Sequence, residues 1–233
     1  MLKADFHIHT SEDPYDDWIK HSAKGLIDKA SREGFDVLSI TNHGIITYNE
    51  ELTEYAKDKG ILLIPGIEQH IDGKEVIIIN APKSIERVKT FMGLKEWKRK
   101  HPNMFVMAPH PFYPKRRCLK NDFFRNIDVF DGVEYCHYYC NGYNPYNKKA
   151  KNMAIKYNKT LIGTSDAHRL IQFNKTYSFI DADQDIDSVI KALKENKVEI
   201  RTRPLSYLSC IRAIVPMTIN RIKKGILNST KSL

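Results

Sequence analysis

The sequence predicts an α/β protein with one domain, in which seven strands alternate with helices and close into a (β/α)7 barrel like the TIM barrel. Short apolar runs alternate with segments whose apolar residues recur every three to four positions, the patterns of strands and amphipathic helices. No linker interrupts this alternation, which is typical of parallel sheets. The chain has 233 residues, 42% of them hydrophobic, which suffices for one continuous core.

Seven apolar runs are the expected strands, and most end in a polar residue capable of chemistry. In chain order they are Lys3–His9, Asp36–His43, Ile61–Glu68, Glu75–Asn80, Met104–His110, Gly132–His137 and Thr160–His168. A short strand-like stretch follows at Val198–Thr202. An open, doubly wound sheet would show the same local pattern, so barrel closure rests on the number of units and the absence of a linker.

The segments between these runs are expected to be helices, because their apolar residues share one face. The groups are Leu26, Ile27 and Ala30; Leu52, Tyr55 and Ala56; Val88, Phe91 and Met92; and Met153, Ala154 and Tyr157. A last helix is expected at Ile186–Asn196. Gly34 and Gly60 follow two of the helices, where glycine adopts a left-handed C-cap conformation at little cost.

The composition changes near residue 204. Residues 1–204 are expected to form the barrel, and residues 205–233 a basic helical extension that packs on the barrel or binds a membrane surface or partner. The net charge of +9 favours anionic partners such as phosphate esters, nucleic acid or acidic lipid. With no apolar leader, no transmembrane run and no CxxC pair, we expect a cytoplasmic protein.

Histidines and carboxylates gather at the carboxyl ends of the expected strands, where parallel barrels place their active sites. They are His7, His9, His43, Glu68, His110, Asp166 and His168. The two-residue spacing of His7 and His9 directs both imidazoles to one face, so they can share an ion. Five strand ends offer more ligands than one tetrahedral ion can use, so we expect two or three ions. Mixed nitrogen and oxygen ligands suit zinc, iron or manganese better than calcium.

The motifs at these ends resemble the ordered motifs of the polymerase and histidinol phosphatase (PHP) family over about residues 1–204. They are Asp5–Thr10, Ile40–His43, Pro65–Glu68, Ala108–Pro111 and Gly163–His168. The resemblance implies a distorted barrel of seven strands and a trinuclear metal site that hydrolyses phosphoesters.

The resemblance also implies a set of ligands. His7, His9, Glu68 and Asp166 would hold one ion, Glu68 would bridge to a second ion that His110 binds, and His43 and His168 would hold the third. Glu68, Asp166 and His110 are the expected catalytic residues. The acidic loop after His9 offers several candidates for one further ligand, of which we choose Asp13, with Asp16 close behind.

This acidic loop is one departure from the family pattern, and two further positions also depart from it. Asn42 stands before His43, where the family usually has an aspartate, and Glu75 stands where the family generally supplies a histidine. Glu75 is nevertheless expected to bind metal, with a shift towards harder ions or a weakly held second ion. Lys115, Arg116 and Arg117 follow His110 within seven residues and either contact a bound phosphate or form a solvated loop.

The sequence therefore predicts a metal-dependent phosphoesterase that uses a metal-activated hydroxide on a nucleotide, an oligonucleotide or a phosphorylated metabolite. Three divalent ions are expected, of zinc, manganese or iron. Two alternatives stay open. One is an amidohydrolase-like deacylase, because that chemistry also uses a His-x-His first strand. The other is a non-catalytic metal-binding regulatory module, which Asn42 and Glu75 keep open.

Overall fold

The computed structural model describes residues 1–206, so residues 207–233, which hold most of the expected basic extension, lie outside the described residues. The described part contains ten strands, six α-helices and one 3-10 helix. In chain order they are β1 (Leu2–Ile8), α1 (Ala23–Arg32), β2 (Val37–Ile40), α2 (Glu50–Asp58), β3 (Leu62–Leu63), β4 (Gly66–Ile71), β5 (Lys74–Ile79), η1 (Lys83–Arg87), α3 (Phe91–Lys100), β6 (Phe105–Ala108), α4 (Asn121–Arg125), β7 (Gly132–Cys136), α5 (Pro145–Lys156), β8 (Thr160–Thr164), β9 (Thr176–Ile180), α6 (Ile186–Lys194) and β10 (Val198–Thr202).

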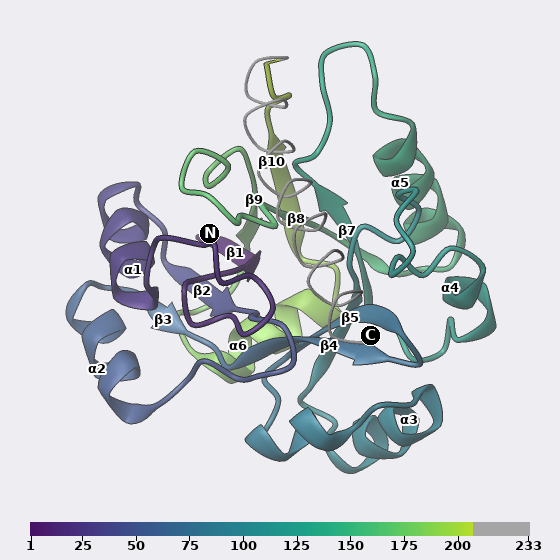
Figure 1. The fold of residues 1–233 in the computed structure, drawn as a ribbon, viewed down its shortest axis with the longest axis horizontal. Coiled ribbons are helices and arrows are strands. Elements are labelled where there is room, and N and C mark those ends of the chain that lie inside the picture. The colour runs from purple at the N-terminus through teal and green to yellow at the C-terminus, as the bar shows by residue number, and fades with distance from the viewer. Residues whose placement is uncertain (207–233) are drawn as a thin grey trace, which may run out of the picture.

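The strands of residues 1–206 form two five-stranded sheets, in the orders β10-β9-β1-β2-β3 and β4-β5-β6-β7-β8. The strands lie in the centre of the molecule, with α1 and α2 on one side and α4 and α5 on the other (Figure 1). Parallel pairing joins β1, β2 and β3, and likewise β6, β7 and β8, whereas β5 and β9 pair antiparallel with their neighbours. The α/β class is confirmed, whereas closure into one seven-stranded barrel is not.

The expected strand Ile61–Glu68 is divided between the two sheets. Pro65, which has no amide hydrogen to donate, separates β3 from β4. β4 continues to Ile71 and pairs antiparallel with β5. Asp72 and Gly73 form the turn between the two strands. Both have positive φ, 48° and 75°, as a type I′ hairpin turn requires. This hairpin makes the second sheet mixed.

The two sheets approach each other at both ends of the strand series. Isolated bridges join Ile8 to Ala167 and His43 to Glu68, directly beyond the ends of β1, β8 and β2. The register of β1 on β2 shifts between Asp5 and Ile8, so β1 carries an irregularity beside these ends. Such irregularities re-aim side chains. The polar strand ends from both sheets therefore share one region.

Three large buried apolar clusters and one small one, of Tyr113, Cys118 and Cys136, hold the elements of residues 1–206 together. The inner cluster combines both sheets with α6, and includes Ala4, Phe6, Val37, Ile64, Ile77, Phe105, Met107, Ile162, Val189 and Leu193. Two outer clusters lie under α1 and α2, and under α3, α4 and α5. Burying each large aliphatic or aromatic side chain contributes about 1.5–3 kcal/mol. The site is therefore built on a packed support.

The helices follow most of the expected patterns. Gly34 and Gly60 have φ of 68° and 76°, which confirms the expected left-handed C-caps. The helix expected around Val88 begins only at Phe91, because the Thr90 side chain accepts a hydrogen bond from the amide of Gly93 and caps it there. The prediction that Val88 belongs to this helix was therefore wrong. No helix within residues 1–206 is long and apolar enough to cross a membrane.

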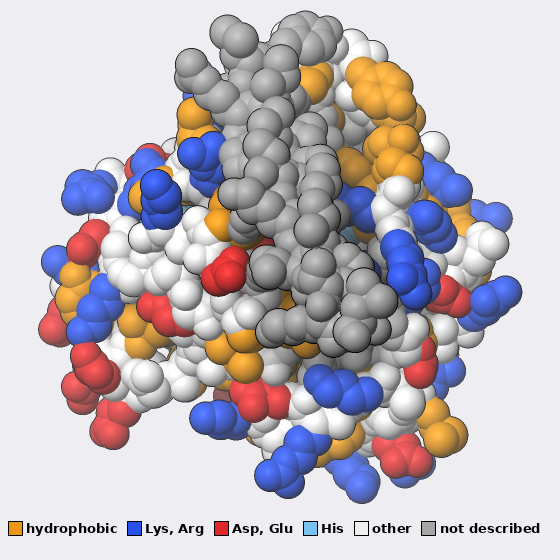
Figure 2. Space-filling view, viewed as in Figure 1, with side chains coloured by type: hydrophobic (Ala, Val, Ile, Leu, Met, Phe, Trp, Pro, Cys, Tyr) orange, Lys and Arg blue, Asp and Glu red, His pale blue; other side chains and the backbone are white. Residues whose placement is uncertain are grey.

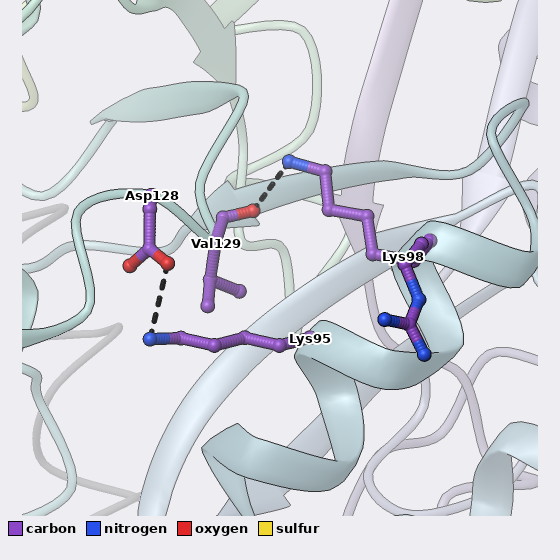
Figure 3. Close-up of a pocket in the computed structure, with 5 residues that line it drawn as sticks. Lys95, Lys98, Asp128 and Val129 are labelled. Atoms are coloured by element: carbon purple, nitrogen blue, oxygen red, sulfur yellow. Dashed lines mark hydrogen bonds and ion pairs between the residues drawn. The ribbon is translucent and has the colours of Figure 1, made fainter.

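A surface hollow of about 260 Å³ lies between α3 and the segment before β7 (Figure 3). Lys95 pairs with Asp128 at 3.0 Å, and the Lys98 ammonium donates to the Val129 carbonyl at 2.7 Å. These basic side chains fasten α3 to the neighbouring segment. The lysines that line the hollow therefore have a structural role.

Gly163 lies where β8 of one sheet meets β9 and β10 of the other. An added Cβ would stand 2.8 Å from the Tyr177 carbonyl oxygen and 2.7 Å from Ile200 Cγ2. We therefore expect Gly163→Ala to lower the free energy of unfolding by about 1–3 kcal/mol, measured by urea denaturation. Gly25→Ala in α1 is the control and should stabilise by about 0.5–1 kcal/mol. Equal stability of Gly163→Ala and the parent would contradict the close approach.

Candidate metal centre

The expected ligands come together at the carboxyl ends of the strands, and each is at most 6% exposed. They are His7, His9, Asp13, His43, Glu68, Glu75, His110, Asp166 and His168. Within the described residues, the ligand atoms of all of these except His168 form groups of three that lie within 4.8 Å of one another. Cys118 and Asp16 join two of these groups. Side chains far apart in the sequence therefore build one centre.

The first group surrounds His7 and His9. Their Nε2 atoms lie 3.2 Å apart, and Asp166 Oδ1 lies 3.4 and 3.6 Å from them. Glu68 Oε2 lies 3.3 Å from His7 Nε2 and 3.2 Å from His9 Nε2. Ligands about 2.1 Å from one ion are separated by about 3.0–3.4 Å in octahedral or tetrahedral geometry. The spacing therefore fits a shared cation.

The hydrogen bonds of the Nδ1 atoms determine whether the Nε2 atoms of His7 and His9 can bind a cation. His7 Nδ1 lies 2.7 Å from Glu134 Oε1, and His9 Nδ1 lies 2.8 Å from Asp13 Oδ2. Because ionised carboxylates only accept hydrogen bonds, each Nδ1 carries the hydrogen and each neutral ring turns the Nε2 lone pair inward. Lone pairs and carboxylate oxygens then converge on one point. Only a cation, a metal ion or protons, satisfies such a set.

The second group lies on the other side of Glu68. Glu68 Oε1 is buried without a hydrogen-bond partner among the described residues and lies 3.5 Å from His110 Nε2. Glu75 Oε2 lies 3.9 Å from the same nitrogen. The Cys118 sulfur lies 3.3 Å from His110 Nδ1. The two oxygens of Glu68 thus face different groups, as a bridging ligand requires.

His43 and His168 are the expected ligands of the third ion. His43 Nε2 lies 3.0 Å from Glu68 Oε2, and His168 Nε2 lies 3.2 Å from Asp16 Oδ2. Asp13 Oδ2 contacts the Nδ1 atoms of both His9 and His43 and accepts the His43 amide hydrogen. Asp13 therefore lies behind the imidazoles, whereas Asp16 faces an Nε2 atom.

The electric fields in the centre are strong. Burial lowers the pKa of His7, but the carboxylates of Asp166, Glu134 and Glu68 raise it well above its ordinary value. Burial raises the pKa of Asp166, and the imidazoles of His7, His168 and His110 lower it below its ordinary value. The buried carboxylates therefore favour the protonated form of His7 when no cation is bound.

Two of the ligands sit on strained backbone. His110 and Asp166 have φ of 28° and 44°, in a region that non-glycine residues rarely adopt. Such conformations cost about 1–3 kcal/mol each and persist where surrounding structure imposes them. The Glu134 carboxylate accepts the His110 amide hydrogen and so holds this strained segment.

Glu134 is a residue that the sequence patterns did not reveal. Its fully buried carboxylate contacts His7 Nδ1, the Thr164 hydroxyl and the His110 amide. A carboxylate inside the apolar run Gly132–His137 was the available signal, because a charged group is rarely buried without a partner. Glu134 therefore connects two expected ligands, His7 and His110, with Thr164 of β8.

Asn42 has a structural role beside the centre. Its side-chain oxygen accepts the Thr10 amide hydrogen at 2.8 Å, and its nitrogen donates to the hydroxyls of Thr10 and Thr47. An ionised aspartate would lack the donor. Asn42 therefore joins the end of β1 to the end of β2. Its side chain contacts none of the expected metal ligands in these hydrogen bonds.

The three basic residues of the loop after β6 differ in their distance from the centre. Lys115 is half-buried, and the carboxylates of Asp166 and Glu75 raise its pKa against the effect of burial, which lowers it. Arg117 lies 3.7 Å from Glu75 Oε1 and 5.8 Å from the Tyr15 ring. Arg116 is exposed, and its carbonyl accepts a hydrogen bond from Lys74. Lys115 and Arg117 are therefore near the ligands.

Comparison with known proteins agrees with these motifs. A family model described as PHP-associated matches residues 144–198, which include Asp166 and His168. The chain is 27% identical over 144 residues to Uncharacterized protein MJ1587 of Methanocaldococcus jannaschii, covering 57% of this chain and 80% of that protein.

Two solved structures share the fold. One is a two-domain protein from Bacteroides vulgatus that contains a predicted PHP-like metal-dependent phosphoesterase. It has a TM-score of 0.66 and 22% identity over 87% of this chain, which spans 65% of that longer protein. The other is PsfC from Pseudomonas syringae, with a TM-score of 0.61 and 16% identity over 95% of this chain and 98% of that one. The expected resemblance to the PHP family is confirmed.

Glu134 should control metal affinity through His7 and His110. We expect Glu134→Gln to weaken zinc or manganese binding by about 10–100-fold, because the neutral amide holds His7 in its required tautomer less firmly. Competition with a chromophoric chelator measures the affinity. Glu199→Gln, on exposed β10, is the matched control and should bind like the parent. Unchanged affinity in Glu134→Gln would show that this carboxylate does not orient the ligands.

The raised pKa values of His7 and His43 predict how stability depends on pH. Groups whose pKa is higher in the folded protein stabilise it fully below the unfolded value of about 6.5, and this stabilisation is lost as pH rises through the folded pKa. The chelator-treated protein should therefore show a falling melting temperature above about pH 6.5. Metal-saturated protein is the control and should not show this fall. Parallel curves with and without metal would contradict the expectation.

Proposed function

We propose that this PHP-like chain is a metal-dependent phosphoesterase that hydrolyses phosphomonoesters or phosphodiesters. The observation that carries the proposal is the convergence of lone pairs and carboxylate oxygens at His7, His9, Glu68 and Asp166, held by buried carboxylates on the opposite ring nitrogens. A buried set of acceptors is stable only around positive charge. The relative from Bacteroides vulgatus, whose name includes a PHP-like metal-dependent phosphoesterase, supports the same activity.

We propose three divalent cations, of zinc, manganese or iron, because nitrogen and oxygen ligands are mixed. The proposed ligand sets are His7, His9, Glu68 and Asp166; Glu68, Glu75 and His110; and His43, His168 and Asp16. Asp16 replaces Asp13 as the acidic ligand from the first loop, because its carboxylate faces His168 Nε2 while Asp13 contacts Nδ1 atoms. Bound divalent cations would acidify a water molecule and neutralise charge on phosphoryl oxygens.

The protein groups around the cations would bind and orient the ester. Lys115, whose ammonium lies 5.1 Å from the centre of the Tyr138 ring, has the charge to contact a phosphoryl oxygen. Arg117 approaches from the rim and stands beside Tyr15. Glu68, whose two carboxylate oxygens face different groups of imidazoles, would be a ligand of two of the cations. The burial of the ligands limits competing water in the site.

The proposed substrate is an anionic phosphate ester, and nucleotides or short oligonucleotides are the favoured class. The chain carries 37 Lys and Arg residues against 28 Asp and Glu, which attracts polyanions. On the face drawn in Figure 2, basic side chains lie in several places and are interspersed with acidic ones. The electrostatic attraction for polyanions is therefore spread over this face. Recognition would therefore rest on the phosphate in the site.

Glu68→Ala should abolish metal-dependent hydrolysis, because the substitution removes the ligand that two of the three proposed sets share. We expect turnover of p-nitrophenyl phosphate with added manganese to fall by at least about 100-fold, while circular dichroism shows a retained fold. Glu51→Ala on exposed α2 is the control and should keep parental turnover. Parental turnover in Glu68→Ala would remove this residue from the mechanism.

A substrate screen separates the competing functions. The wild-type protein, with manganese or zinc, is tested on phosphorylated metabolites, short oligonucleotides and N-acyl compounds. Hydrolysis of phosphate esters supports the proposal. Hydrolysis of amides alone would favour a deacylase, and tight metal binding without any turnover would favour a regulatory module.

A further inference from the structure

His70 and Glu75 form a cross-strand pair at the end of the β4–β5 hairpin nearest the site. Their Cα atoms are partners in the antiparallel register. His70 lies two residues after Glu68 on β4, so the two side chains point to the same face. Directly opposed residues on one face have Cβ atoms about 4.5–5.5 Å apart. The hairpin therefore adds an imidazole and a carboxylate beside the bridging Glu68.

The His70 imidazole has an unused nitrogen. His70 Nε2 is buried and has no hydrogen-bond partner among the described residues, although the side chain as a whole is 19% exposed. Leaving a buried polar atom unsatisfied costs about 1–3 kcal/mol. The edge of the Tyr15 ring packs against the imidazole, with ring centroids 5.3 Å apart. A buried imidazole nitrogen in this position is suited to bind a cation.

Glu75 lies between His70 and His110. Its Oε1 atom is 3.9 Å from His70 Nε2, and its Oε2 atom is 3.9 Å from His110 Nε2. The backbone amide of Glu75 donates to the Arg117 carbonyl at 3.0 Å, which fixes this end of β5 to the loop after β6. The carboxylate therefore connects two imidazoles that the sequence separates by forty residues.

We propose that His70 is a ligand of the second cation, together with Glu75, His110 and the bridging Glu68. This inference rests on the proposed metal-dependent function. Two imidazoles and two carboxylates form a borderline ligand set that suits zinc, iron or manganese, whereas Glu75 and Glu68 with a single imidazole would favour harder ions. His70 thus restores, from the neighbouring strand, the nitrogen that Glu75 does not supply.

An orienting role for His70 is the alternative, in which its imidazole only positions the Glu75 carboxylate. The two roles differ in one observable property, direct bonding between the imidazole nitrogen and the cation. A nitrogen bonded to cadmium shows scalar coupling to the ¹¹³Cd nucleus, whereas a nitrogen that only contacts a carboxylate does not.

The test uses the full chain with ¹⁵N-labelled histidine, loaded with ¹¹³Cd²⁺. We expect the Nε2 resonance of His70, assigned by its disappearance in His70→Gln, to be split by ¹¹³Cd, as are those of His7 and His110. An unsplit His70 resonance beside split resonances of the other two would overturn the inference and leave the proposed function standing. Failure of the wild-type protein to bind ¹¹³Cd²⁺ would contradict the proposed function and the inference together.

Metal content provides a second measurement. His70→Ala, dialysed against zinc and then against a weak chelator, should retain one ion fewer than the wild-type protein. The expected loss of affinity for that ion exceeds about 100-fold, the upper end for residues that only orient a ligand. His101→Ala, at the C-terminus of α3, is the matched control and should retain every ion. Full metal content in His70→Ala would overturn the inference.

Discussion

The structure depends on one electrostatic constraint, the burial of many hydrogen-bond acceptors at one point. His7 and His9 face each other through their Nε2 atoms at 3.2 Å, with Glu68 Oε2 at a similar distance from both. Outer carboxylates, Glu134 and Asp13, hold the opposite nitrogens as donors. This arrangement is unstable without positive charge, because desolvated lone pairs and carboxylates repel one another. A cation therefore completes the fold at the same place where it would perform chemistry.

The backbone reaches this arrangement through local departures from regular structure. The register of β1 shifts directly beside His7, and His110 and Asp166 adopt positive φ. Gly163 permits β8 to approach β9 of the other sheet more closely than any side chain would allow. Each departure costs folding free energy, and the packed clusters under the helices offset it. The ligands converge because the supporting layers are rigid enough to impose strain.

Much of the site could be predicted from sequence, because its ligands stand at the ends of apolar runs that become β1, β2, β4, β6 and β8. Sheet pairing was harder to predict, since hydrogen bonds between distant strands leave no local pattern. Asp72 and Gly73 are turn residues typical of a hairpin, and Thr176–Ile180 shows the alternation of a strand, but the seven expected strands include neither feature. Glu134 was overlooked because one carboxylate in an apolar run resembles a solvent-facing residue until its partners are known.

Charge balance explains why the proposed centre needs several cations. Within residues 1–206, six buried or half-buried carboxylates contact the imidazole rings: Asp13, Asp16, Glu68, Glu75, Glu134 and Asp166. Three divalent cations would neutralise them, whereas one would leave a strongly negative pocket that repels a phosphate ester. Asn42, being neutral, keeps the number of carboxylates from rising further while its amide joins Thr10 and Thr47. With the carboxylates balanced, Lys115 and Arg117 would be the charges that attract the proposed anionic substrate.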